Sequence, residues 1–212
     1  ANVNLIVGKQ AQPWTRTASY FWDGDLTPEG ATLKYTSGPW SAGLYYDWLC
    51  ERSANNTLTV DNAGLRTDSK MVGAQFTGKQ SVGKVNFTGA VGYFDVRHVK
   101  GEVAAAGTGC TVNPAISGSS NGNTTITASY PTATGGSVSC TVLASDFNIL
   151  NVLLQADTTI GRFPFSAFVD YMQNDGAEIN SVAGKKLDTA IAYGFTFNRA
   201  AAAKTWEIGY VY

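Results

Sequence analysis

Apolar side chains recur at every second position in this chain, in one stretch after another. In the closing segment 204–212, KTWEIGYVY, the side chains of Trp206, Ile208, Tyr210 and Tyr212 share one face. A two-residue period indicates a β-strand with one apolar face, because successive side chains point to opposite sides of the backbone. No stretch has the 3.6-residue period of an amphipathic helix. We therefore expect an all-β protein.

The same alternation predicts nine strands in the 212 residues of the chain. They are expected at 2–8, 30–36, 40–50, 69–77, 85–96, 147–156, 164–172, 187–198 and 204–212. The opposite faces of these strands are mostly small or polar, with residues such as Asn4, Thr88 and Gly194. The alternation alone does not say which face is inside. A soluble sheet buries its apolar face, whereas a membrane barrel turns that face toward lipid.

The connections between the strands alternate between long and short. Long connections lie at 9–29, 51–68, 97–146 and 173–186, and short turns separate them. Outer-membrane barrels have short periplasmic turns and long extracellular loops, with aromatic residues such as Trp40 here near the strand ends. We therefore expect an antiparallel up-and-down transmembrane β-barrel, with 97–146 as a long extracellular loop. A soluble β-barrel is the alternative.

Three parts of the chain resemble the porin family of Gram-negative outer membranes. Segment 7–10, VGKQ, followed by 22–35, WDGDLTPEGATLKY, is similar to a Trp-Asp-x-Asp-x-x-Pro-Glu-Gly segment that leads into a strand in that family. Segments 163–177 and 204–212 resemble later strands of the same family. The resemblance implies a diffusion channel for small hydrophilic solutes or ions, either monomeric or a homotrimer, surrounded by outer-membrane lipid. It also implies sequence before and after 1–212.

The strand number also predicts that 1–212 forms a segment of a wider barrel, of about 16–18 strands. With the short turns on the periplasmic side, the first and the ninth strand both run outward, whereas complete bacterial barrels have an even number of strands. The alternative is that Tyr212 is a true terminal aromatic residue and that one more strand lies near 17–24. A lining rich in Gly, Ser, Thr and Asn, with few large residues, suits a water-filled centre.

Charged residues on the polar faces are the candidate pore-lining residues. The alternation of side chains along each strand places five charged residues on this lining: Lys34, Asp47, Asp170, Asp188 and Glu207. Many pores set their selectivity with facing rings of charge.

The long connections carry charges of both signs. Their cations are Arg16, Arg52, Arg66, Arg97 and Lys100, and ordinary solvated loop charge explains each of these taken alone. An acidic cluster, Asp23, Asp25 and Glu29, lies in the first long connection. If this connection folds toward the lumen, the acids would favour cations. A Ca²⁺ site is the lesser alternative, because the spacing is not that of an EF-hand loop and turn formation accounts for these residues.

The cysteines suggest one cross-link. Cys110 and Cys140 bracket a long connection that contains two β-like runs, 124–130 and 137–143, so we expect a disulfide between them. Two free thiols are the alternative. Cys50 lies on the apolar face of the third predicted strand without an obvious partner, and we expect it in lipid or at its interface.

Composition and motifs exclude several function classes. The net charge of −1 offers no basic surface for nucleic acid. No nucleotide-binding motif and no Gly-x-Ser-x-Gly is present, and the single histidine, His98, is expected at a strand exit. We therefore expect neither enzymatic activity nor a cofactor. The rival function is a non-conducting surface protein, whose barrel anchors the 97–146 loop for adhesion or for a surface layer.

Overall fold

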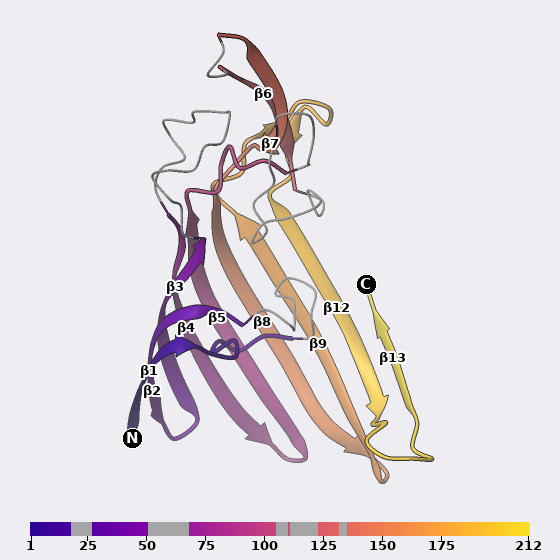
Figure 1. Ribbon diagram of the computed structural model, residues 1–212. Helices are drawn as coiled ribbons and strands as arrows, with labels where there is room; N and C mark the ends of the chain where they lie inside the picture. Colours follow the sequence, from indigo (N-terminus) through magenta and orange to yellow (C-terminus); the bar gives the residue numbers. More distant parts are fainter. Residues whose placement is uncertain (18–26, 51–67, 105–109, 111–122, 132–134) are drawn as a thin grey trace.

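The nine expected strands form a single antiparallel sheet in the computed structural model (Figure 1). The structure describes residues 1–17, 27–50, 68–104, 110, 123–131 and 135–212. In sheet order the strands are β1 (Asn2–Lys9), β2 (Glu29–Ser37), β3 (Trp40–Cys50), β4 (Ser69–Val82), β5 (Val85–Arg97), β8 (Phe147–Ile160), β9 (Phe163–Asn174), β12 (Thr189–Asn198) and β13 (Glu207–Val211). The prediction of an all-β, antiparallel, up-and-down arrangement is therefore confirmed.

Two hairpins stand apart from this sheet. β6 (Thr125–Pro131) pairs with β7 (Ser137–Leu143), as the two β-like runs in the long connection predicted. β10 (Ile179–Asn180) pairs with β11 (Lys185–Lys186), a short hairpin that the sequence did not predict because each strand has only two residues. Among the described residues no helix is long and apolar enough to span a membrane.

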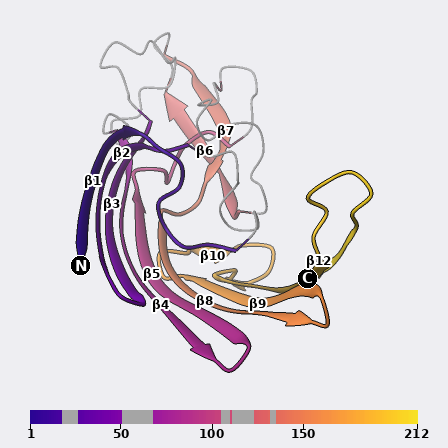
Figure 2. The same ribbon diagram turned by 90° about the horizontal axis from the view of Figure 1, so that it is seen from below.

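The nine-stranded sheet is open in the described part of the chain. β1 and β13 are its two edges, and neither pairs with the other. The described residues therefore do not form a closed barrel, although their sheet is strongly curved, as the arc in Figure 2 shows. The hairpin turns at one end are tight. Gly83 and Gly161 adopt left-handed φ angles of 59° and 63°, which glycine tolerates without a Cβ clash.

The strand register aligns side chains of one kind into continuous rows. One apolar row crosses six adjacent strands through Leu5, Leu33, Leu44, Ala74, Tyr93 and Leu150. This row lies on the convex face, where Leu5 is 69 % exposed and Leu44 57 % exposed. Polar residues such as Thr32 and Gln75 lie on the concave face and are buried. The sheet thus turns its apolar side outward, the reverse of a soluble half-buried sheet.

The concave face nevertheless holds an apolar cluster, against the expectation of few large residues there. Trp14, Tyr45, Met71 and Phe94 are all at most 4 % exposed and pack together. Tyr45, Met71 and Phe94 lie at strand positions whose side chains point to the polar face. They were overlooked because the other residues on that face are mostly small or polar.

The Cys110–Cys140 disulfide is present, as expected from the sequence. It lies against Val142 in a small apolar cluster beside the β6–β7 hairpin. An isolated bridge pairs Val103 with Val142, and Gly101 N–H donates to the Leu143 carbonyl over 2.8 Å. The segment that follows β5 is thus joined to the hairpin by the disulfide and by backbone hydrogen bonds. Cys50 ends β3, and its side chain is outside the described part of the structure.

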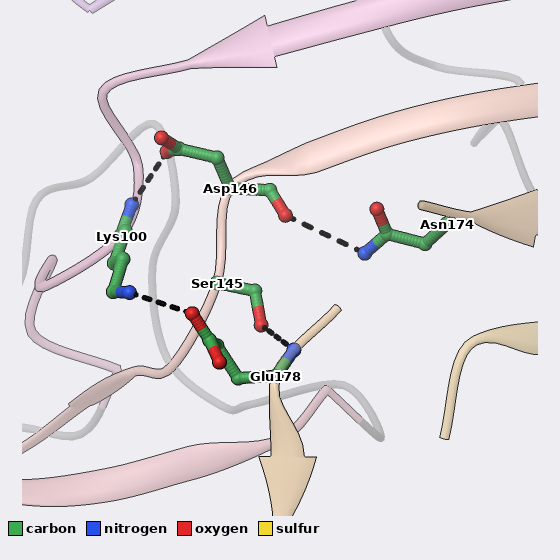
Figure 3. A network of polar contacts seen from close by, with 5 residues as sticks. All are labelled: Lys100, Ser145, Asp146, Asn174 and Glu178. Atoms are coloured by element: carbon green, nitrogen blue, oxygen red, sulfur yellow. Dashed lines mark hydrogen bonds and ion pairs between the residues drawn. The ribbon is translucent and has the colours of Figure 1, made fainter. Parts of the chain in front are cut away.

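A polar network joins three connections at the same end of the sheet (Figure 3). The Asp146 carboxylate accepts hydrogen bonds from the backbone N–H groups of Val99 and Lys100, over 2.8 and 2.9 Å. The Lys100 ammonium reaches Glu178 over 3.0 Å, and the Glu178 N–H donates to the Ser145 hydroxyl over 2.9 Å. The hydrogen bond from Lys100, together with its charge, lowers the pKa of Glu178 below its ordinary value.

Replacing Asp146 by alanine should loosen the segment that follows β5. The change leaves two backbone N–H groups without their acceptor, which costs about 1–3 kcal/mol locally. Hydrogen exchange at Val99 and Lys100 should therefore accelerate, while amides in the middle of β5 stay protected. Glu178→Gln is the matched control: it removes only an exposed ion pair and should change exchange little. Equal acceleration in both variants would contradict the role given to Asp146.

Candidate functional site

The most elaborate arrangement of polar groups lies on the concave face, under the segment that follows β1. We call residues 10–17 the strap. Figure 2 shows this segment, in indigo, running inside the arc of the sheet. Its contacts begin at β2, where Gln10 Nε2 donates to Thr32 Oγ1 over 2.9 Å. They end at β9, where Thr17 Oγ1 donates to Asp170 Oδ2 over 2.8 Å. The strap therefore crosses the concave face from β2 to β9.

The middle of the strap is joined to β4 by paired hydrogen bonds. The backbone N–H of Thr15 donates to Gln75 Oε1 over 2.7 Å, and Gln75 Nε2 donates to the Thr15 carbonyl over 2.8 Å. The hydroxyls of Thr15 and Thr77 lie 3.0 Å apart. A side-chain amide thus satisfies both backbone groups of one strap residue, in the way that a neighbouring strand would.

Trp14 supplies the apolar contact of the strap. Its ring lies edge-on to Tyr45 and to Phe94, with ring centroids 5.5 Å apart in both pairs. Tyr45 and Phe94 are stacked on each other at 6.0 Å. A Cβ added at Gly73 would lie 2.6 Å from the Phe94 ring, so the glycine lets this ring lie flat against the sheet. The rings of β3 and β5 therefore form a platform on which Trp14 sits.

Two carboxylates are buried in this region. Asp170 is 3 % exposed, and both its oxygens accept hydrogen bonds, Oδ2 from Thr17 and Oδ1 from Asn151. Asp47 is 0 % exposed and lies beside the Gln10 side chain of the strap, although neither of its oxygens has a well-aligned hydrogen-bond partner among the described residues. The Oε1 atom of Gln10 also has no partner there. Asp47 and Asp170 are on the concave face, as strand parity predicted, but they are shielded from the solvent.

The other three pore-lining candidates lie apart from these two. Lys34 is partly exposed on β2 and is paired in register with Gly43. Asp188 is partly exposed immediately before β12, where its carboxylate accepts a hydrogen bond from the Thr189 hydroxyl over 3.1 Å. Glu207 is exposed at the start of β13, beside the far end of β12. The five charges therefore do not form a ring at one level.

The acidic cluster is described only at Glu29. Asp23 and Asp25 lie outside the described residues. Glu29 is exposed on β2, and its side chain belongs to the convex face, because its neighbour Gly30 and then Thr32 are buried on the other side. No group of metal-ligating side chains occurs in the part of the chain that the structure describes.

Comparison with known proteins gives no relative from which this arrangement could be interpreted. The chain matches no protein family, no curated protein and no solved structure. The concave face must therefore be interpreted from its own contacts.

Sequence reasoning missed the strap and its main contacts, those of Trp14 with the Tyr45 and Phe94 rings and of Thr15 with Gln75. One signal was present. Tyr45, Met71 and Phe94 interrupt an otherwise small and polar face, and large apolar side chains on such a face need a cover of their own. The cover itself, a tryptophan in the segment after β1, cannot be recognised without knowing where that segment runs.

Proposed function

We propose that this sheet is part of an outer-membrane β-barrel through which small hydrophilic solutes or ions diffuse passively. The observation that carries the proposal is the apolar convex face, on which Val91 is 51 % and Ile191 53 % exposed. Burying one such side chain is worth about 1.5–3 kcal/mol. A face of this kind, repeated over nine strands, is stable only against an apolar phase. Lipid is such a phase, and the polar concave face then borders the lumen.

The arrangement of the connections supports the same proposal. Tight turns join β2 to β3, β4 to β5 and β8 to β9 at one end of the sheet, whereas the β6–β7 hairpin and the β10–β11 hairpin lie at the other end (Figure 1). This asymmetry is typical of outer-membrane barrels, whose long loops face outward from the cell. The disulfide at the loop end suits an oxidising compartment.

The directions of the two edge strands add a geometric condition. Because all neighbours in the nine-stranded order are antiparallel, β1 and β13 run in the same direction. Direct pairing of these edges would be parallel. Antiparallel closure needs an odd number of further strands, and nine plus an odd number is even, as in bacterial barrels.

Conductance of the full-length protein in a planar lipid bilayer tests the proposal. Discrete, ohmic steps are expected. Spin labels at Leu44 and Phe195 on the convex face should be reached by a lipid-soluble quencher, whereas labels at Thr88 and Thr196 on the other face should be protected. Protection of the first pair with access to the second would reverse the assignment of the faces and contradict the proposal.

A non-conducting surface anchor is the second candidate, and one observation favours it. The strap and the Trp14 cluster occupy part of the concave face that a pore would leave to water. In that case the barrel serves to display the disulfide-linked β6–β7 hairpin. Protein that inserts with its convex face in lipid but never conducts would support the anchor over the pore.

A further inference from the structure

We infer that Arg16 sets the ion selectivity of the pore and makes it prefer anions to cations. The inference rests on the proposed function, because it concerns the ions that pass along the concave face. It differs from what the number of lining charges suggests, because four of the five pore-lining candidates are acids and only Lys34 is a cation. The reason is that the strap determines which of these charges can act on a passing ion.

The strap is fixed at several points, so its position is well determined. β2 and β9 are separated in the sheet by β3, β4, β5 and β8. Because the sheet is curved, the strap spans its concave side by a shorter path than the one along the sheet. Gln10 is held on β2, Thr15 on β4 and Thr17 on β9. The strap therefore lies across the concave face.

The side chains that flank Arg16 are used to attach the strap. Thr15 bonds to β4 and Thr17 bonds to β9. Arg16 is partly exposed, and its Nη1 donates only a 3.4 Å hydrogen bond to the carbonyl of Thr17. No carboxylate of the described residues forms an ion pair with it. None of the described carboxylates therefore neutralises its positive charge, which a guanidinium keeps across the physiological pH range.

The acids beneath the strap are shielded from the lumen. Asp170 is 3 % exposed and accepts hydrogen bonds from Thr17 and Asn151, and Asp47 is 0 % exposed. The guanidinium of Arg16 is partly exposed and can act on a passing ion, whereas these carboxylates are buried. Asp188 and Glu207 lie at opposite ends of the β12–β13 pair, far from each other along the strands. Among the described residues, the charge that remains accessible beside the strap is therefore positive.

Reversal potentials of the full-length protein in a KCl gradient across a planar bilayer test the inference. The unmodified pore should favour chloride over potassium. Arg16→Gln should lower the chloride-to-potassium permeability ratio about 30-fold, because one nearby charge in water attracts chloride by ~1 kcal/mol and repels potassium by as much. Arg16→Glu should bring the ratio below one. Arg16→Lys, which keeps the charge, should retain the anion preference.

Arg162→Gln is the matched control. Arg162 lies in the β8–β9 turn with its guanidinium over the Phe163 ring, 5.1 Å from the centroid, so its loss removes the same charge away from the strap. It should leave the reversal potential unchanged. Arg16→Gln protein that conducts with the same reversal potential as the unmodified protein would overturn the role of Arg16. The proposal that the protein forms a pore would remain supported. Folded protein that never conducts would overturn both proposals.

Discussion

Replacing Trp14 by alanine should detach the middle of the strap from the sheet. Trp14 is 4 % exposed and packs edge-on against Tyr45 and Phe94. Truncating a buried tryptophan costs about 3–5 kcal/mol, because apolar contacts are lost and a cavity remains. The hydrogen exchange of the Thr15 amide, which is bonded to Gln75, should accelerate at least ~100-fold. If the barrel conducts, its unitary conductance should also rise, because a freed strap no longer occupies a fixed part of the lumen.

Trp40→Ala provides the matched control for this change. Trp40 is 50 % exposed on the convex face, where its ring stacks on Phe76 at 5.5 Å. Losing one exposed aromatic pair costs about 1 kcal/mol, and the Thr15 amide should keep its protection. An unchanged Thr15 exchange rate in Trp14→Ala would show that the hydrogen bonds of Thr15 and Thr17 hold the strap without the tryptophan.

The second large effect is expected from removing the Cys110–Cys140 disulfide. The two cysteines are separated by 30 positions in sequence. Closing a loop of this size contributes about 3–4 kcal/mol in the chain-entropy model. The hairpin of β6 and β7 has only two strands, and an isolated two-stranded hairpin is marginally stable in water. The double variant Cys110→Ser with Cys140→Ser should therefore lose amide protection throughout this hairpin.

The effect should stay confined to the loop end of the molecule. β5 and β8 pair with each other along eleven register positions from Asn86 to Val96, and this pairing does not involve the disulfide. Their amides should remain protected, and conductance should persist if the protein is a pore. Cys50→Ser is the control, because it replaces a cysteine without breaking the cross-link. Loss of protection in β5 and β8 as well would show that the hairpin and the sheet unfold together.

The strands were predictable because their signal is local. Every expected strand is present, although β4 and β8 extend beyond the predicted ends, to Val82 and Ile160. The alternation weakens there, since Lys79, Gln80 and Ser81 follow one another in β4. Backbone pairing with the neighbouring strand continues through these residues all the same. The final length of each strand is set by its register with the neighbouring strand and by the geometry of the turn. The alternation of apolar and polar residues predicts these two only indirectly.

The candidate site was predictable only in part. Strand parity placed Asp47 and Asp170 correctly on the concave face, because each strand fixes which way its side chains point. It could not tell that both would be covered, since the cover comes from a segment without any periodicity. Arg16 is the clearest case. In sequence it is one of several loop cations, and only the contacts of Thr15 and Thr17 place it across the sheet.

The sequence by itself determined the all-β class, the order and direction of the strands, the division into an apolar and a polar face, and the pairing of two cysteines. All of these follow from residue spacing, which acts over a few positions or, for the cysteines, within one connection. Only the tertiary structure decided that the apolar face is convex and exposed, that β1 and β13 stay unpaired with each other in the described part of the chain, and that two acids are buried beside the strap. These features depend on the curvature of the sheet and on contacts between residues far apart in the chain, such as Thr17 and Asp170. The spacing of side chains over a few positions does not determine either of them.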